Sequence, residues 1–261
     1  GRARDLRRRT RRAIRPARRL LLIYRFVDCA YDLARVEAGR EAYLREHIPG
    51  ASFLGIDELS DLSVEGRGRH PLPGADAFAA AASRAGIGEG VFVVAYDHGA
   101  AGGAARLWWL LRHFGHEEVA VLRGGFESWL GPARGGEERI EPADFVARPR
   151  TGDTIEAEEL AARLGEPGLT IVDARSPERY RGEAEPIDPV SGRIPGAVSW
   201  PHGTELPPGV AEAGEIVVYC GSGVTACVDL LALARAGRPD ARLYPGSWSE
   251  WCGRGLPADR G

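Results

Sequence analysis

Short apolar, β-branched runs alternate along the chain with longer segments in which apolar residues recur at helical spacing. Residues 91–96 and 216–219 are continuous apolar runs typical of buried strands. Residues 103–114 and 224–236 predict amphipathic helices. Their apolar stripes consist of Leu107, Leu110, Leu111 and Phe114 in the first helix and of Val224, Cys227, Val228, Leu231 and Ala234 in the second. Further short strands are expected at 119–122 and 242–244. The order strand, helix, strand therefore predicts an α/β fold with parallel sheets.

The same series of features occurs twice. Each series begins with a segment that contains Val-Asp, at residues 26–30 and 171–175. An Ile-Pro-Gly-Ala segment follows, at 48–51 and 194–197, and then the buried strand. A Gly with a Trp five residues later completes each series, and the offset stays between 122 residues (Gly124 to Gly246) and 146 residues (His47 to Arg193). Such a pattern indicates a tandem duplication. We predict domains at 26–130 and 154–256, joined by a Gly-, Pro- and charge-rich linker at 131–153.

Charge is distributed unevenly over the 261 residues. All 34 basic residues are arginine, and residues 1–25 hold 11 of them with a single acid, Asp5. This basic head fits three interpretations: a nucleic-acid-tethering arm, an organelle transit peptide (although it lacks Ser), or a solvated or non-native start, which we favour. The rest of the chain carries 23 Arg against 36 acidic residues. We therefore expect no nucleic-acid partner, because phosphate contacts need clustered positive charge.

Apolar stretches and cysteine content indicate the cellular compartment of the protein. The longest apolar stretch near the N-terminus, residues 20–24, is far too short for a bilayer span or a signal-peptide core. Four cysteines in a chain of this length are too few for a disulfide scaffold, and none is spaced for a zinc site. We expect a reduced, cytoplasmic protein with no membrane contact, no metal and no cofactor.

The most informative segment is the loop at residues 220–226, Cys-Gly-Ser-Gly-Val-Thr-Ala, between a predicted strand and a predicted helix. Ligands bind at the carboxyl ends of strands in open parallel sheets. Glycines allow successive N–H groups to point at one centre, and the helix N-terminus adds positive partial charge there. A cysteine so placed can have its pKa lowered to roughly 3.5–7.5. We therefore predict that Cys220 is a reactive thiolate, whereas Cys29, Cys227 and Cys252 are structural.

Two chemistries use a cysteine in such a loop. Phosphatases with a Cys-x5-Arg loop need an arginine six residues after the cysteine, where this chain has Ala226. The shorter, uncharged loop suits a single sulfur atom better than a tetrahedral phosphate. This argues for sulfur transfer, in which the thiolate takes a sulfane sulfur from a donor, becomes a persulfide and passes the sulfur to an acceptor.

Residues 26–256 resemble the rhodanese superfamily, specifically its two-domain sulfurtransferases. The resemblance rests on both Ile-Pro-Gly-Ala segments, residues 172–175, Arg-Tyr-Arg-Gly at 179–182, the Cys220 loop and Pro-Gly-Ser-Trp at 245–248. It implies two rhodanese-like α/β domains, each a parallel sheet flanked by helices, of which the second is catalytic. Asp97 stands where the first domain would have its cysteine, consistent with the loss of that site.

The resemblance also implies roles for individual residues. Arg179 would bind the anionic group of the donor, and His70 and Asp57 would polarise Ser222. The backbone of the loop, including Gly221, Gly223, Val224 and Thr225, would surround the donor sulfur. The uncharged Gly221 and Ser222 resemble the 3-mercaptopyruvate type of loop, whereas the thiosulfate type carries two basic residues there. The donor would be 3-mercaptopyruvate, with thiosulfate second, and the acceptor cyanide, a thiol or a thioredoxin-like protein.

Two positions depart from the family pattern. The second carboxylate-binding arginine of the animal mercaptopyruvate enzymes would fall near Asp188, an acid, and Arg193 replaces the His usual before the second Ile-Pro-Gly-Ala. A non-catalytic rhodanese-like module that binds a partner or senses redox state remains the alternative function.

Overall fold

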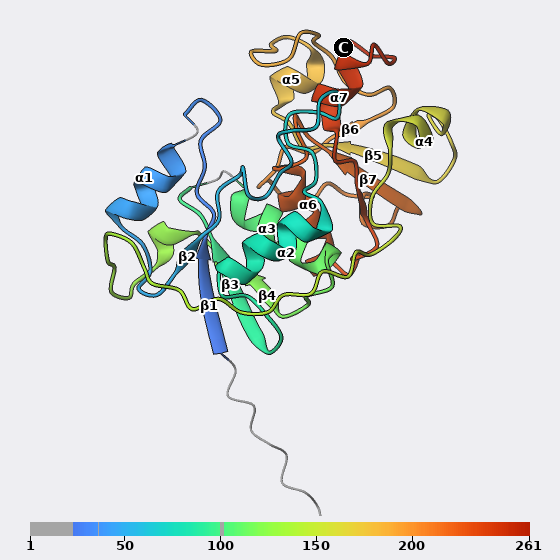
Figure 1. Ribbon diagram of the computed structural model, residues 1–261. Coiled ribbons are helices and arrows are strands. Elements are labelled where there is room, and N and C mark those ends of the chain that lie inside the picture. The colour runs from blue at the N-terminus through green and yellow to red at the C-terminus, as the bar shows by residue number, and fades with distance from the viewer. Residues whose placement is uncertain (1–22, 36, 100–101) are drawn as a thin grey trace, which may run out of the picture.

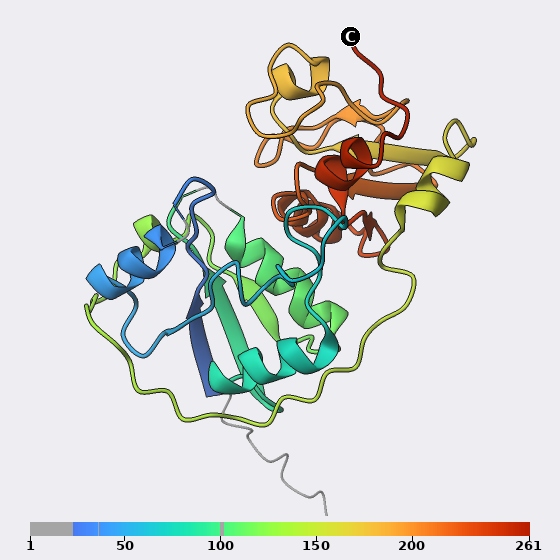
Figure 2. The ribbon, with the colours of Figure 1, turned by 45° about the horizontal axis from the view of Figure 1, so that its top comes forward.

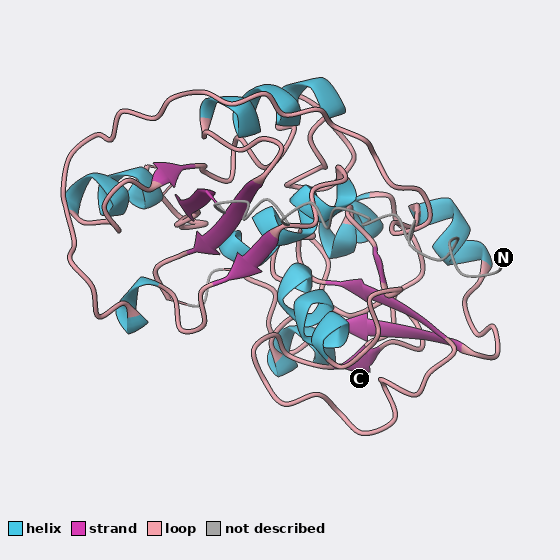
Figure 3. Ribbon diagram, turned by 90° about the horizontal axis from the view of Figure 1, so that it is seen from below, coloured by secondary structure: helices cyan, strands magenta, loops and turns pink. Residues whose placement is uncertain are grey.

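The structure, a computed structural model, describes residues 23–261 except 36, 100 and 101. Most of the predicted basic head, residues 1–22, therefore lies outside the described residues. The described part contains two four-stranded parallel sheets with flanking helices, which confirms the predicted α/β fold class. Figure 3 shows the two sheets as separate groups of strands with helices around them.

The first sheet has the strand order β2-β1-β3-β4. Its strands are β1 (Ile23–Asp28), β2 (Ser52–Phe53), β3 (Val91–Tyr96) and β4 (Val119–Val121). β3 has the predicted bounds, because its apolar run is continuous and buried. β1 begins at Ile23, three residues before the expected start, because Ile23 pairs with Val91 of β3.

The second sheet repeats this order as β6-β5-β7-β8. Its strands are β5 (Leu169–Asp173), β6 (Val198–Ser199), β7 (Glu215–Tyr219) and β8 (Arg242–Leu243). The shared order and the parallel pairing of every neighbouring pair support the duplication inferred from the sequence. The two-residue strands β2 and β6 follow the Ile-Pro-Gly-Ala segments and are too short to give a sequence signal of their own.

The Ile-Pro-Gly-Ala segments form the same turn in both domains. Gly50 and Gly196 have positive φ angles of 77° and 76°, which an L side chain rarely adopts and which a turn with Pro at its first central position requires at its second. A tyrosine at the end of each central strand fixes the turn: the hydroxyl of Tyr96 accepts the N–H of Ile48, at 3.2 Å, and that of Tyr219 accepts the N–H of Ile194, at 3.1 Å. The repeated sequence motif is therefore a repeated hydrogen-bonded turn.

Helices flank both sheets. The helices of the first half are α1 (Ala38–Arg45), α2 (Ala75–Arg84), α3 (Gly103–His113) and the 3-10 turn η1 (Phe126–Ser128). Those of the second half are α4 (Ala157–Ala162), α5 (Pro177–Arg181), α6 (Ala226–Arg235) and α7 (Ser247–Gly253). α3 packs against α6, and Figure 1 shows both in the middle of the molecule. One buried core consequently includes residues of both domains.

The contact between α3 and α6 changes the predicted stripes. Residues 103–111 of α3 are all buried, rather than one face alone, because the helix lies between its own sheet and the other domain. In α6 the fully buried positions are Ala226, Cys227, Asp229, Leu230 and Leu233. Of the predicted stripe, Val224 and Cys227 are buried, whereas Val228, Leu231 and Ala234 are only half-buried, so the prediction was right for two positions and wrong for three.

The segment between the domains, 131–153, contains no helix or strand longer than a single bridge. Figure 2 shows it running around the outside of the first domain before it reaches the second. An antiparallel bridge from Arg134 to His47 and a bond from the N–H of Ala143 to the Ser83 carbonyl attach it to that domain. In the described part of the chain, no helix has the length and apolar character needed to cross a membrane.

Candidate active site

Cys220 lies directly after β7, at the carboxyl end of the central strand, and only 1% of it is exposed. Its Sγ accepts the backbone N–H of Gly223, at 3.1 Å, so the loop curls back over the sulfur as the glycine pattern predicted. Gly223 has a φ of 76°, and a Cβ there would collide with the Pro245 carbonyl oxygen. The loop can therefore take this shape only with glycine at position 223.

The residues after β8 hold the loop from the other side. The N–H of Cys220 donates to Ser247 Oγ, at 3.1 Å, and this hydroxyl donates to the Tyr244 carbonyl, at 3.0 Å. The carbonyl of Cys220 accepts the N–H of Trp248, also at 3.0 Å. Ser247 is the one non-glycine residue with positive φ (53°) in the described chain. The Pro-Gly-Ser-Trp segment is thus a support for the Cys220 loop.

Ser222 and His70 meet across the domain boundary. His70 Nδ1 lies 2.8 Å from Ser222 Oγ. Burial, together with the cations Arg106 and Arg69, lowers the pKa of His70 to about 4. His70 is therefore uncharged at neutral pH and can exchange a proton with the serine hydroxyl. Asp57 is exposed in the turn after β2, and no hydrogen bond joins it to either residue among the described side chains.

Arg106 of α3 connects the same parts of the two domains from inside. It is fully buried, and its guanidinium donates to the carbonyls of Gly223, at 3.0 Å, His70, at 3.1 Å, and Leu59, at 3.4 Å. It thereby fixes the His70 segment relative to the Cys220 loop. Burial lowers the pKa of Arg106, while the nearby thiols of Cys227 and Cys220 raise it. The site therefore has a buried positive charge behind the sulfur.

Arg179, on the short helix α5, lies on the outer side of the loop. A Cβ built on Gly221 would be 3.1 Å from Arg179 Nη1, so the guanidinium is adjacent to the residue after Cys220. Glu185 binds Arg179 at 2.7 Å, and Asp188 binds it at 3.0 Å. Val224 is buried, and Thr225 precedes the first residue of α6. The predicted residues Cys220, Ser222, His70 and Arg179 are consequently together in space, whereas Asp57 is not bonded to them.

The other three thiols differ from Cys220 in their surroundings. Burial raises the pKa of Cys227 to about 12, that of Cys29 well above its usual value, and that of Cys252 as well. These thiols are therefore protonated at neutral pH. In the first domain Asp97 follows β3 as Cys220 follows β7, and its Oδ2 accepts the N–H of Ala104, at 3.2 Å. A carboxylate there satisfies the start of α3 but supplies no nucleophilic sulfur.

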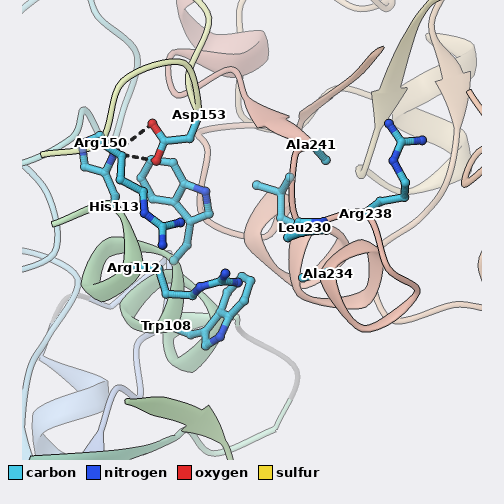
Figure 4. Close-up of a pocket in the computed structure, with 11 residues that line it drawn as sticks. Trp108, Arg112, His113, Arg150, Asp153, Leu230, Ala234, Arg238 and Ala241 are labelled. Atoms are coloured by element: carbon cyan, nitrogen blue, oxygen red, sulfur yellow. Dashed lines mark hydrogen bonds and ion pairs between the residues drawn. The ribbon is translucent and has the colours of Figure 1, made fainter. Parts of the chain in front are cut away.

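A small cavity between the domains lies away from this loop. Its volume is about 30 Å3, and it lies between α3, the end of the linker and the C-terminal half of α6. Figure 4 shows the contact of His113 with the Asp153 carboxylate, at 2.9 Å, on one side of the cavity. Such a volume holds water but no sulfur donor. The described residues include no group of three or more His, Cys, Asp or Glu placed to hold a metal ion.

Two arginines of the site were not predicted from the sequence. Arg106 lies inside the apolar pattern of α3, and Arg69 precedes the predicted His70. A charged residue at a buried position of a helix is a signal for Arg106, because such a position needs hydrogen-bond partners. For Arg69 no signal existed, since the chain has 34 arginines and no local pattern distinguishes this one from the others.

Comparison with known proteins assigns the two halves to one family. The rhodanese-like domain family matches residues 23–131 and 156–254. A probable 3-mercaptopyruvate sulfurtransferase of Pseudomonas aeruginosa is 41% identical over 86% of this chain and 88% of its own length. A putative thiosulfate sulfurtransferase, SseB, of Mycobacterium tuberculosis is 41% identical over 82% of each chain. The crystal structure of SseA from Escherichia coli, a 3-mercaptopyruvate sulfurtransferase, has a TM-score of 0.75 and 32% identity, covering 87% of this chain and 93% of that one.

Proposed function

The chain belongs to the rhodanese family and is a two-domain sulfurtransferase, and from this premise we propose that Cys220 carries the transferred sulfur as a persulfide. The observation that supports this most directly is the position of the sulfur. Cys220 Sγ lies at the end of β7 and accepts the Gly223 N–H, at 3.1 Å. The buried cation of Arg106 lies behind the loop. Both stabilise negative charge on the sulfur.

In the first half of the reaction, the Cys220 thiolate attacks the sulfur of 3-mercaptopyruvate. An S–S bond forms, the C–S bond of the donor breaks, and the electron pair of that bond stays on the carbon. The donor is thereby reduced to the enolate of pyruvate while the cysteine sulfur is oxidised to a persulfide. The proton from the donor thiol passes through Ser222 and His70 to the pyruvate carbon. Their 2.8 Å separation supports this transfer.

In the second half, a thiolate or cyanide attacks the outer sulfur of the persulfide. The acceptor forms a bond to this sulfur, the S–S bond breaks, and Cys220 leaves as the thiolate in which it began. A cellular acceptor is a thiol or a thioredoxin-like protein. No other group changes its oxidation state, so the cycle is complete with one donor and one acceptor and follows ping-pong kinetics.

The charges near the loop support a donor with one negative charge. Three arginines and three acids alternate in contact with one another beside Gly221; they are Asp173, Arg175, Glu185, Arg179, Asp188 and Arg69. This group has no net charge when all six residues are ionised. A dianion such as thiosulfate gains less from a neutral group than from an excess of cations, so 3-mercaptopyruvate is the preferred donor.

Intact mass measurement tests the proposal. The protein is incubated with 3-mercaptopyruvate and no acceptor, and its mass is compared with that of Cys220→Ser treated in the same way. We expect the mass of the parent protein to increase by one sulfur atom and to return to its original value after a thiol is added. The mass of Cys220→Ser should not change. Cys227→Ser is the matched control and should still gain the sulfur, because burial raises the pKa of Cys227 to about 12.

The opposite result identifies the alternative function. A parent protein that takes up no sulfur from either 3-mercaptopyruvate or thiosulfate is a non-catalytic module. Turnover that persists in Cys220→Ser contradicts the assignment of the nucleophile.

A further inference from the structure

Arg69 of the first domain lies beside the same loop residue as Arg179 of the second. A Cβ built on Gly221 would be 2.7 Å from Arg69 Nη2 and 3.1 Å from Arg179 Nη1. The two guanidinium groups therefore approach the residue after Cys220 together, although they are 110 positions apart in the sequence. Two cations this close repel each other unless an anion lies between or beside them.

The structure supplies one such anion from the protein itself. Asp188 binds Arg69 through Oδ1 and Arg179 through Oδ2, and only 4% of its side chain is exposed. Asp188 thus uses one nitrogen of each arginine, Nη1 of Arg69 and Nη2 of Arg179. The carboxylate therefore joins the two guanidinium groups to each other.

The nitrogens directed at Gly221 have no such partner. Neither Arg69 Nη2 nor Arg179 Nη1 makes a hydrogen bond to any described residue. Arg69 Nε is also buried without a partner in this part of the chain. Of these three nitrogens Arg69 Nε is the buried one, and a buried guanidinium nitrogen without an acceptor is unfavourable. Arg69 Nη2 and Arg179 Nη1 remain free to donate to a bound anion. The unused donors of two arginines therefore converge on one place.

The position of Arg69 is fixed by the second domain. Its backbone N–H donates to Ser249 Oγ of α7, at 3.1 Å. Gly68, with a φ of 88°, lies so close to Gly246 that a Cβ would be 2.6 Å from the Gly246 carbonyl oxygen. The segment before His70 is thus attached to the same turn that supports Cys220, which preorganises the side chain of Arg69.

The family resemblance already implies that Arg179 binds the anionic end of the sulfur donor. We propose that Arg69 of the first domain is the second arginine of this site, and that Asp188 is the fixed counterion that keeps the two arginines side by side. The chemistry of the ligand is a planar carboxylate, or the SO3 group of thiosulfate, next to a transferable sulfur. Two oxygens of such a group can take one N–H from each arginine. This inference rests on the proposed function, because a donor whose anionic group binds beside Gly221 would have its transferable sulfur next to Cys220.

The test compares Arg69→Ala and Arg69→Lys with the parent, using 3-mercaptopyruvate and thiosulfate in parallel. We expect Arg69→Ala to raise KM for the donor by about 10-fold to 100-fold, because one charge-assisted hydrogen bond to the donor is lost. kcat should fall much less, since the interaction is made in the ground state as well. Arg69→Lys should recover part of the affinity.

The matched control is Arg67→Ala. Arg67 is two residues away and also forms an ion pair with the second domain, to Glu156 at 2.8 Å, but its side chain is 51% exposed. Its removal should leave KM for both donors unchanged, because exposed pairs contribute little. A binding measurement by calorimetry in the Cys220→Ser background separates affinity from turnover. Arg69→Ala added to that background should weaken binding of the unreacted donor by the same factor.

The outcomes are distinct. A raised KM for 3-mercaptopyruvate alone shows that the site binds the carboxylate, and a raised KM for thiosulfate alone shows that it binds the SO3 group. A raised KM for either donor, or for both, supports the two-arginine site. An unchanged KM for both donors, or a loss of kcat with unchanged KM and binding, overturns it and leaves Arg69 as a domain contact. Neither result bears on Cys220, whose own test is the loss of persulfide formation in Cys220→Ser.

Discussion

His70 Nδ1 lies 2.8 Å from Ser222 Oγ, although the two residues are 152 positions apart and belong to different domains. The bond places a neutral imidazole next to the Cys220 loop, since the pKa of His70 is lowered to about 4. The first domain has Asp97 rather than a cysteine after β3, but it supplies His70, Arg69 and Arg106 to the site of the second. The tandem arrangement therefore places side chains of the first domain beside the Cys220 loop of the second.

We expect His70→Ala to lower kcat/KM for 3-mercaptopyruvate at pH 7 by up to about 30-fold. A thiol with a pKa of about 8.5 is only about 3% ionised at pH 7, which limits what assisted deprotonation can contribute. At pH 9 the solvent deprotonates the donor, so the defect should shrink to a few-fold. Steady-state rates at the two pH values measure this difference.

The matched control for His70 is His98→Ala. His98 follows β3 of the first domain, where it bonds Asp28 at 3.0 Å, and no hydrogen bond joins it to Cys220, Ser222 or His70 among the described residues. Its loss should leave the rate unchanged at both pH values. A defect in His70→Ala that is equally large at pH 7 and pH 9 would contradict a role in proton transfer.

We expect Arg106→Ala to destabilise the protein and to reduce turnover. The carbonyls of Gly223, His70 and Leu59 would lose their donor in a buried place. We expect the loss of the donor for these three carbonyls to lower the free energy of unfolding by about 2–4 kcal/mol, because water can replace Arg106 only in part. Urea unfolding and the rate with 3-mercaptopyruvate measure the two effects.

Arg112→Ala provides the comparison for Arg106. Arg112 is on the same helix but pairs with the exposed Glu117, at 3.1 Å. Its removal should change the free energy of unfolding by less than about 1 kcal/mol and leave the rate as it was. An Arg106→Ala protein that is as stable and active as Arg112→Ala would show that Arg106 does not organise the loop.

The sequence predicted most of the fold because its signal is local. The run at residues 91–96 is apolar throughout, and β3 has these bounds. The Ile-Pro-Gly-Ala segments could be recognised as a repeated motif, and the structure shows that each is a turn in which glycine has a positive φ. In contrast, β2 and β6 have two residues each and depend on pairing with a neighbouring strand rather than on their own composition.

The site was only partly predictable for a related reason. Cys220 stands in a loop whose glycines have a local purpose, so sequence reasoning reached it directly. His70 came from resemblance alone, since a histidine in a Gly- and Pro-rich segment is usually an exposed loop residue. Arg69 reaches the site through the contact of its segment with α7. That contact is a property of domain packing, which no local pattern encodes.

We expect the stability of the protein to depend on pH through Asp229. Its two carboxyl oxygens are buried with no hydrogen-bond partner among the described residues. Burial, with the charges of Cys220 and Asp173, raises the pKa of Asp229 from 3.8 to about 8. Between these values the folded chain binds a proton that the unfolded chain releases, so this contribution to stability is complete below about pH 4 and is lost as the pH rises to about 8.

Asp229→Asn should remove this dependence. The difference in unfolding free energy between Asp229→Asn and the parent should shift in favour of the variant by about 3 kcal/mol between pH 5 and pH 8. Asp240→Asn is the control, because Asp240 pairs with Arg238 at the surface, at 2.8 Å. Parallel pH profiles for the parent and Asp229→Asn would mean that Asp229 is ionised in the folded protein.

The last prediction concerns the choice of donor and follows from Asp188. Asp188→Asn removes one negative charge from the neutral group of arginines and acids beside Gly221, and its amide offers the two arginines one acceptor oxygen in place of the two of the carboxylate. The resulting net charge of one should favour a dianion over a monoanion. We expect the ratio of kcat/KM for thiosulfate to that for 3-mercaptopyruvate to rise by about 3-fold to 10-fold, since a partly buried unit charge contributes about 1 kcal/mol or slightly more.

Salt and a second acid provide the controls for this ratio. The gain should diminish as ionic strength rises, because the Arg69 side chain is 27% exposed and the screening length falls to about 8 Å at 0.15 M. Glu183→Gln removes an acid that is 55% exposed and paired with Arg181. It should leave the ratio unchanged. Gly221→Arg is unsuitable for the same purpose, since its side chain would enter the space next to Arg69 and Arg179. If Asp188→Asn leaves the donor ratio at the parent value at low salt, the balance of charge beside Gly221 does not determine which donor the enzyme prefers, and shape alone must do so.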